Sequence, residues 1–151
     1  MMKGKSCFFI GHRETSENRL SSLENAIEQH IVEYDVTEFI VGAYGGFDHL
    51  AATAVIQAKQ KHPGISLILL APYHPAERPI EKPEGFDGIY YPPDMEKVPR
   101  RFAIVRANHY VIDHVDYLIA YIWHSASNAK NLTEYAQRRA QKGLITVTVL
   151  A

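Results

Sequence analysis

Apolar positions form five short runs, and the segments between them repeat apolar residues at helical spacing. The runs cover residues 7–10 (CFFI), 39–42 (FIVG), 65–71 (ISLILLA), 116–123 (DYLIAYIW) and 144–150 (LITVTVL). Near-continuous apolarity over a short stretch is typical of strands that are covered on both faces. The pattern therefore predicts five buried β-strands.

Amphipathic helices are predicted in the intervals between these strands. Apolar residues recur with helical period within residues 15–34, 47–61, 102–112 and 132–142. Alternating strands and helices call for parallel strands joined by right-handed crossovers, which place helices on both faces of an open sheet. Five strands are too few for an eight-fold barrel. We therefore expect one α/β domain over residues 1–151, a Rossmann-like, doubly wound, mainly parallel five-stranded sheet in a three-layer sandwich.

One region, Pro72 to Pro99, breaks this alternation. It holds seven of the eight prolines, together with Phe86, Tyr90 and Tyr91. An irregular segment of this length in a compact domain is usually functional or disordered, and disordered segments are poor in aromatic residues. We therefore expect a packed flap at about residues 72–99.

Composition narrows the range of partners. Lys plus Arg (16) nearly balance Asp plus Glu (17), so nucleic acid is an unlikely main partner for a chain that lacks a basic surplus. The single cysteine, Cys7, lies in an apolar run and excludes an internal disulfide. No stretch reaches about 18 consecutive apolar residues, and the first residues lack a secretory pattern. We expect a cytoplasmic protein with no membrane partner, and the sequence leaves a homo-oligomer open.

Candidate ligand-binding residues follow the predicted strands, because open α/β sheets bind ligands at the carboxyl ends of their strands. Gly11 permits close backbone approach, and Arg13 offers a planar cation for phosphate. The glycine-rich turn of residues 42–48 precedes a helix, where backbone N–H groups favour an anion. Its Asp48 can cap that helix or accept a hydrogen bond from a ribose hydroxyl. The full set is Gly11, His12, Arg13, Gly42, Tyr44, Gly45, Gly46, Asp48, Tyr73, His74, Asn108, His124, Ser125, Ser127 and Asn128.

No motif for a metal or a tightly bound cofactor is present. Residues 42–48 match neither the dinucleotide-binding GxGxxG pattern nor a Walker A loop. Four histidines, His12, His49, His74 and His124, fall near the predicted strand ends, but none forms a close His-x-His or His-Glu-x-x-His pair. We expect neither a metal nor a cofactor.

Three segments together resemble the SLOG superfamily, which unites Smf/DprA proteins, the LOG phosphoribohydrolases and YpsA-like proteins. FFIGHR is similar to the first strand of the family, which ends in Gly-Ser-Arg. GAYGGFDHLAATAVIQA resembles the Smf pattern Gly-x-Ala-x-Gly-Ile-Asp-x-x-Ala-His, and RANHYVIDHVDYLIAYI resembles the Arg-Asn helix with its following strand. The resemblance implies a Rossmann-like domain that binds nucleotides or nucleotide-derived ligands through residues 11–13 and 42–48.

The resemblance implies three alternative functions, of which the sequence favours one. LOG enzymes carry a Pro-Gly-Gly-x-Gly-Thr-x-x-Glu motif with an upstream arginine; here residues 124–134 keep Glu134 but contain no glycine, and Arg106 lies one residue from the expected register. This favours a YpsA-like protein that binds or senses a phosphate-bearing, nucleotide-like small molecule. The alternative is an N-glycosidic hydrolase or transferase, of phosphoribohydrolase or deoxyribosyltransferase type, with Glu134 and Arg106 as catalytic residues. The third is an Smf-like DNA-binding protein.

Overall fold

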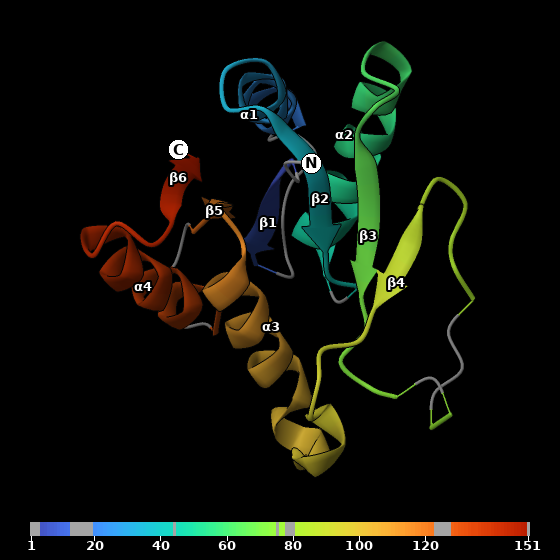
Figure 1. The fold of residues 1–151 in the computed structure, drawn as a ribbon, viewed down its shortest axis with the longest axis vertical. Helices are drawn as coiled ribbons and strands as arrows, with labels where there is room; N and C mark the ends of the chain where they lie inside the picture. The colour runs from blue at the N-terminus through green and yellow to red at the C-terminus, as the bar shows by residue number, and fades with distance from the viewer. Residues whose placement is uncertain are drawn as a thin grey trace.

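The chain is built from helices and parallel strands in the computed structural model, which describes residues 4–12, 20–43, 45–74, 76–77, 81–122 and 128–150 (Figure 1). The strands are β1 (Lys5–Gly11), β2 (Val36–Val41), β3 (Ser66–Leu70), β4 (Gly88–Tyr90), β5 (Tyr117–Tyr121) and β6 (Thr146–Leu150). The α-helices are α1 (Leu20–Val32), α2 (Gly46–Lys61), α3 (Ala103–His114) and α4 (Asn128–Gln141), and two short 3₁₀ helices, η2 (Met95–Lys97) and η3 (Arg100–Phe102), precede α3. Within this part of the chain, no helix is both long and apolar enough to cross a bilayer.

The strands form one six-stranded sheet in the order β4-β3-β2-β1-β5-β6, and every neighbouring pair is parallel. From β1 the chain adds β2, β3 and β4 in one direction, then returns to add β5 and β6 on the other side of β1. The order therefore reverses between β1 and β5, and this switch point is where open α/β sheets bind ligands. The Rossmann-like, doubly wound α/β fold expected from the sequence is confirmed.

The number of strands is a correction, because the sequence predicts five and the sheet has six. The additional strand, β4, is three residues long and pairs with β3 at the edge of the sheet. Gly88-Ile89-Tyr90 contains too few apolar residues to form a recognisable run, and it lies within the proline-rich region. Its pairing depends on the position of β3 rather than on its own pattern.

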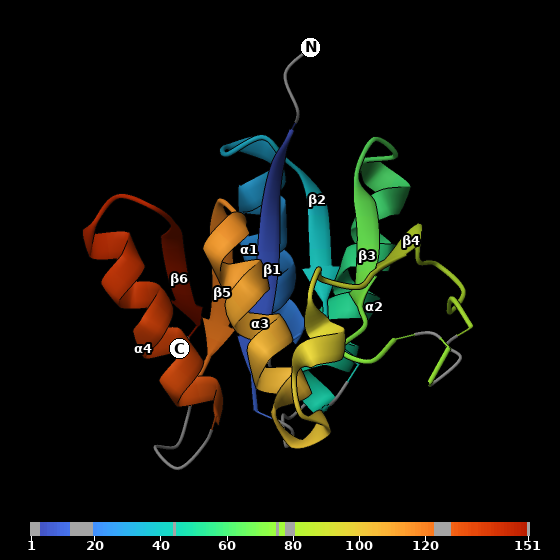
Figure 2. The same cartoon turned by 60° about the horizontal axis from the view of Figure 1, so that its bottom comes forward.

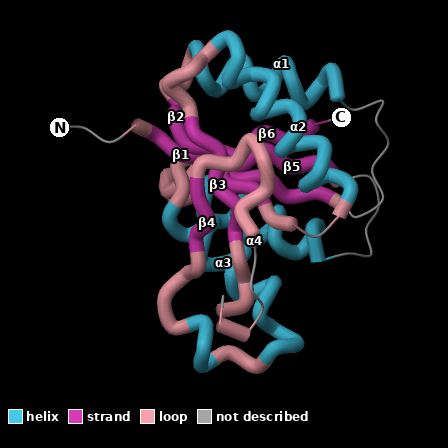
Figure 3. The backbone as a smooth tube through the Cα atoms, turned by 90° about the vertical axis from the view of Figure 1, so that its right-hand side faces the viewer, coloured by secondary structure: helices cyan, strands magenta, loops and turns pink. Residues whose placement is uncertain are grey.

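Helices cover both faces of the sheet, α1 and α2 on one side and α3 and α4 on the other. Figure 2 shows α3 crossing in front of the central strands with α1 and α2 behind them, and Figure 3 shows α1 and α3 on opposite sides of the strands. Side chains alternate accordingly along β1: Cys7 and Phe9 belong to the core beneath α1 and α2, and Phe8 and Ile10 to the core beneath α3 and α4. Burial raises the pKa of the Cys7 thiol well above its usual value, so this cysteine acts as a small core residue.

Residues 87–90 lie along β3 at the edge of the sheet, and Tyr91, Met95 and Val98 beyond them pack on the α3/α4 core. The Asp87 carboxylate accepts hydrogen bonds from Lys59 Nζ at 2.6 Å and from the Leu67 backbone N–H at 2.8 Å. These hydrogen bonds lower the pKa of Asp87. Phe86 packs against the α1/α2 core, and Tyr90 against the α3/α4 core. Whether this segment closes over a ligand, as a flap would, stays a prediction.

Candidate functional site

A cavity of about 500 Å³ lies at the carboxyl ends of β1, β2 and β3, where α3 and α4 begin. Its volume is within the range of about 300–1,000 Å³ that is usual for small-molecule sites. The polar part of its described lining consists of Gly11, His12, Gly42, Asp48, Arg101, Asn108 and Asn128. The apolar part includes Leu70, Pro72, Ile104, Val105, Ala129 and Leu132. A site with an apolar wall and a few convergent polar groups is suited to a small organic ligand.

The end of β1 is fixed by close contact with the first turn of α2. A Cβ atom on Gly11 would lie only 2.2 Å from Cγ of Phe47, so a side chain at this position has no room. The Phe47 backbone N–H donates to the His12 carbonyl oxygen at 3.3 Å, and the His12 side chain is buried, with 3% of its surface exposed. Gly11 therefore lets the helix start approach the strand end, and both residues line the cavity.

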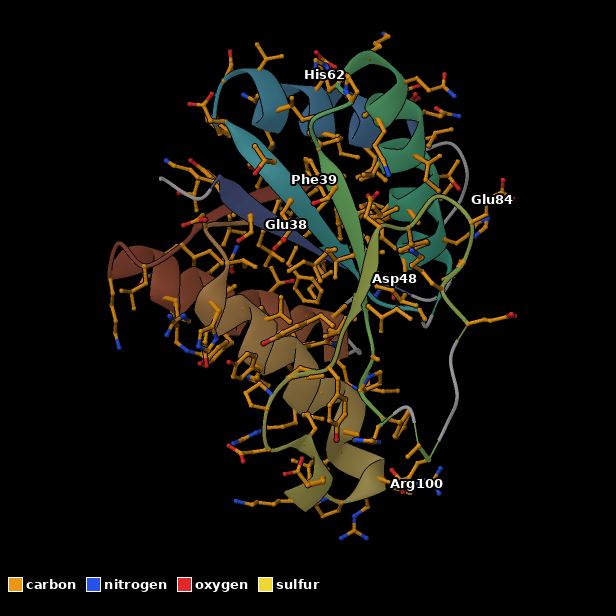
Figure 4. The ribbon with its side chains drawn as sticks, turned by 45° about the vertical axis from the view of Figure 1, so that its right-hand side comes forward. Glu38, Phe39, Asp48, His62, Glu84 and Arg100 are labelled. Carbon is orange, nitrogen blue, oxygen red and sulfur yellow. The ribbon has the colours of Figure 1, made fainter. Side chains whose placement is uncertain are left out.

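The start of α2 places a carboxylate directly over the end of β2. Gly45 is the N-cap residue of α2, and its φ of 139° lies in a region that favours glycine. Asp48 follows in the first turn, where a negative charge stabilises the helix. A Cβ atom on Gly42 would lie 2.9 Å from Oδ2 of Asp48, so the missing side chain makes room for the carboxylate. Figure 4 marks Asp48 beside the strand ends.

One side of α3 and η3 faces the cavity through Arg101, Ile104, Val105 and Asn108. Their spacing of three, one and three residues is that of one face of a helix. Arg106 is exposed and is not among the described lining residues, because it lies off this face. Asn108 belongs to the residues predicted from the sequence, whereas Arg101, which is typical of a solvated arginine before a helix, does not, although both line the cavity.

At the start of α4, Asn128, Ala129 and Leu132 line the cavity. Glu134 is exposed instead, and its Oε2 lies 3.2 Å from Nζ of Lys130, in an ion pair along the helix surface. Glu134 is not among the described lining residues, so the cavity and this carboxylate are separate. The other predicted residues of this loop, His124, Ser125 and Ser127, lie outside the described residues, as do Arg13 and Tyr44.

The loop after β3 contributes Pro72 to the cavity rather than the predicted Tyr73 and His74. Tyr73 packs against the α3/α4 core, and Cζ of Arg100 lies 5.7 Å from the centroid of its ring. His74 is exposed, and its Nδ1 accepts a hydrogen bond from the Ala76 backbone N–H at 2.9 Å. Both residues therefore hold the loop, and neither is among the described lining residues.

Asp48 supplies the acidic side chain and Arg101 the permanently basic one among the described lining residues. In the same described ranges, no three His, Cys, Asp or Glu side chains cluster closely enough to hold a metal ion. The sequence matches no protein-family model and no curated protein, so the interpretation of the cavity rests on its own geometry and chemistry.

Proposed function

We propose that the cavity binds a phosphate-bearing, nucleotide-like small molecule, and that the protein is a SLOG-like binding or sensing module. The observation that supports this proposal most strongly is the position of the cavity, at the point where the strand order reverses. Two helices, α2 and α4, begin at its margin, and each has a residue of its first turn in the lining. Backbone N–H groups at helix starts favour anions, and Arg101 adds a planar cation that suits phosphate.

The remaining lining favours a ligand with one flat apolar part. The apolar lining combines Leu70 and Pro72 at the end of β3 with Ile104, Val105 and Leu132 from α3 and α4. A nucleobase can pack on this lining while sugar and phosphate contact the strand ends and helix starts. The near-neutral net charge of −1 supports a small ligand over a long polyanion.

Binding is favoured over N-glycosidic cleavage by the position of the two proposed catalytic residues. Glu134 is paired with Lys130, and neither Glu134 nor Arg106 is among the described lining residues of the cavity. A carboxylate that acts at a glycosidic bond must reach the bond inside the ligand site. If free base were released from a nucleoside monophosphate, and Glu134→Gln abolished the release, the hydrolase alternative would replace this proposal.

Isothermal titration calorimetry with AMP, GMP, CMP, UMP and ADP-ribose tests the proposal. We expect at least one of them to bind with a Kd below about 1 mM, the weak end of specific affinity. Arg101→Ala should weaken that binding by about tenfold, as expected for the loss of a hydrogen bond to a charged group. Arg100→Ala is the matched control, because Arg100 neighbours Arg101 but is not among the described lining residues. Absence of binding across the panel would contradict the proposal.

A further inference from the structure

The two helix starts at the cavity lie on opposite sides of β1. Since β2 and β5 are the two neighbours of β1 in the sheet, α2, which follows β2, and α4, which follows β5, start on either side of the β1 end. They also belong to opposite layers, α2 with α1 and α4 with α3. The cavity is therefore bounded by α2 on one side and by α4 and α3 on the other.

These two sides differ in charge. The first turn of α2 carries Asp48, whereas the first turn of α4 carries no acidic residue, and its Lys130 is paired with Glu134. Arg101 lines the cavity from η3, which leads into α3 and so lies in the same layer as α4. Among the described lining residues, the α2 side thus presents a carboxylate, and the α3/α4 side presents a guanidinium group.

A carboxylate at the α2 side changes what that helix start can bind. Phosphate next to Asp48 would bring two negative charges together, which raises the free energy of binding. Hydroxyl groups have the opposite preference, because a carboxylate has about four acceptor positions and can accept from a ligand while it keeps a partner within the protein. The space beside Gly11 is filled by Phe47 and that beside Gly42 by the Asp48 carboxylate, so this carboxylate is the acceptor that the α2 side offers to a ligand.

We propose that Asp48 is a specificity-determining residue, which accepts hydrogen bonds from the hydroxyls of a ribose while the phosphate lies on the Arg101 and α4 side. The inference rests on the proposed function and adds the class of ligand, which is ribonucleotides in preference to 2′-deoxyribonucleotides. Oδ2 of Asp48 lies 2.9 Å from the place of a Cβ on residue 42, so a glycine there leaves room for the carboxylate.

A purely structural role for Asp48 predicts something different. If the carboxylate only stabilises the start of α2 through the helix dipole, its replacement lowers stability but leaves the relative affinity for ribose and deoxyribose ligands unchanged. The ratio of the two affinities is therefore the informative readout, and the absolute affinity is not.

Matched pairs of ligands test the proposal by calorimetry: AMP with dAMP, GMP with dGMP, and CMP with dCMP. The unmodified protein should bind the ribonucleotide of its preferred pair at least about tenfold more tightly, the factor expected for one hydrogen bond to a charged acceptor. Asp48→Asn should reduce that ratio to less than about threefold, since neutral hydrogen bonds are weaker. Arg101→Ala, the control, should weaken both members of the pair and preserve the ratio.

Gly42→Ala provides a second variant that keeps the carboxylate but displaces it, because the new Cβ would lie 2.9 Å from Oδ2 of Asp48. We expect this variant to lose part of the ribose preference, so the proposal stays testable even if Asp48→Asn unfolds. Equal affinity of the unmodified protein for both members of every bound pair would overturn the inference and leave the proposed function intact. An unchanged ratio in Asp48→Asn would overturn it as well, whereas no binding of any nucleotide would overturn the proposed function itself.

Discussion

The two faces of the sheet are built from the same strands, yet the side chains near the carboxyl ends of the strands pack differently on each face. On the α1/α2 face, aromatic rings fill the space: the Phe9 centroid lies 5.9 Å from that of Phe39 and 6.5 Å from that of Phe47, and Phe47 lies 6.1 Å from Tyr121. On the α3/α4 face, the helices bury alanines, Ala103, Ala107, Ala129 and Ala136. Large rings therefore pack up to the strand ends on the first face, whereas on the second face two of these alanines, Ala107 and Ala129, line the cavity.

The α1/α2 face has a function of its own, because it positions the polar side of the cavity. Phe47 fills the space above Gly11 and donates its backbone N–H to His12, so the aromatic cluster holds the end of β1 and the start of α2 together. The α3/α4 face supplies volume and part of the apolar lining. The α1/α2 face therefore orients polar groups, and the α3/α4 face leaves space for a ligand. Pockets for small molecules are usually preformed in this way, with an apolar lining and a few fixed polar groups.

Among the substitutions considered, loss of the Phe47 ring should lower the stability of the protein most. Phe47 is fully buried among aromatic neighbours, so Phe47→Ala leaves a cavity that the surrounding rings cannot fill. We expect the free energy of unfolding in urea to fall by about 3–5 kcal/mol. Val32→Ala is the control, because Val32 is 60% exposed and its replacement should change stability by less than about 0.5 kcal/mol. A loss below about 1 kcal/mol for Phe47→Ala would show that the α1/α2 face is not closely packed.

Gly11→Ala should have the next largest effect, since it adds a group where Phe47 leaves no space. The new Cβ would lie 2.2–2.6 Å from three atoms of Phe47, and one of them is the Cβ of that residue. Overpacking of this kind costs about 1–3 kcal/mol. The matched control is Gly64→Ala, whose added Cβ meets no atom within 4 Å. Equal thermal midpoints for the two variants would contradict the close approach of α2 to β1.

Acid should also lower the free energy of unfolding, because His30 is buried on the α1/α2 face. His30 is fully buried in α1, its Nδ1 lies 2.6 Å from the Ala26 carbonyl oxygen, and burial lowers its pKa from the usual 6.5. Below that value the unfolded chain binds a proton that the folded protein disfavours, so stability declines as the pH falls through and below 6.5. Urea unfolding at about pH 7.5 and about pH 5.5 should show this decline, and His30→Leu should reduce it. An unchanged pH dependence in His30→Leu would exclude His30 as its source.

The sequence predicts those elements that have a recognisable local pattern of apolar residues, and it does not predict those that form through tertiary pairing. Buried strands such as Phe8–Ile10 are apolar because helices cover both faces, so the pattern alone identifies them. The edge strand β4 is half-buried and only three residues long, and its pairing with β3 is a tertiary effect that no local pattern records. The class of fold was therefore predictable, and the sixth strand was not.

The site shows the same limit. Gly11, His12, Gly42 and Asp48 were predictable because they directly follow strands whose ends must meet at one edge. It is harder to predict which residues of a helix line the cavity. Successive side chains point about 100° apart, so neighbours in sequence can face the cavity and the solvent respectively. Asn108 and Arg106 are two residues apart, yet the former lines the cavity and the latter is exposed. Which of the two lines the cavity depends on the direction in which α3 crosses the sheet, and the sequence does not give this direction.

The smallest effect on stability should come from a large substitution on the α3/α4 face. Val105 is half-buried and lines the cavity, so the ring of Val105→Phe can enter the space that the described lining residues leave between them. We expect a loss of less than about 1 kcal/mol, below the usual cost of overpacking a filled core. The same substitution should abolish the proposed nucleotide binding, because the ring would take the place of the base in the cavity. Val149→Phe, at a position that is 48% exposed on β6, should alter neither property. If Val105→Phe destabilised the protein as much as Gly11→Ala, the two faces would be equally filled, and the contrast between them would be wrong.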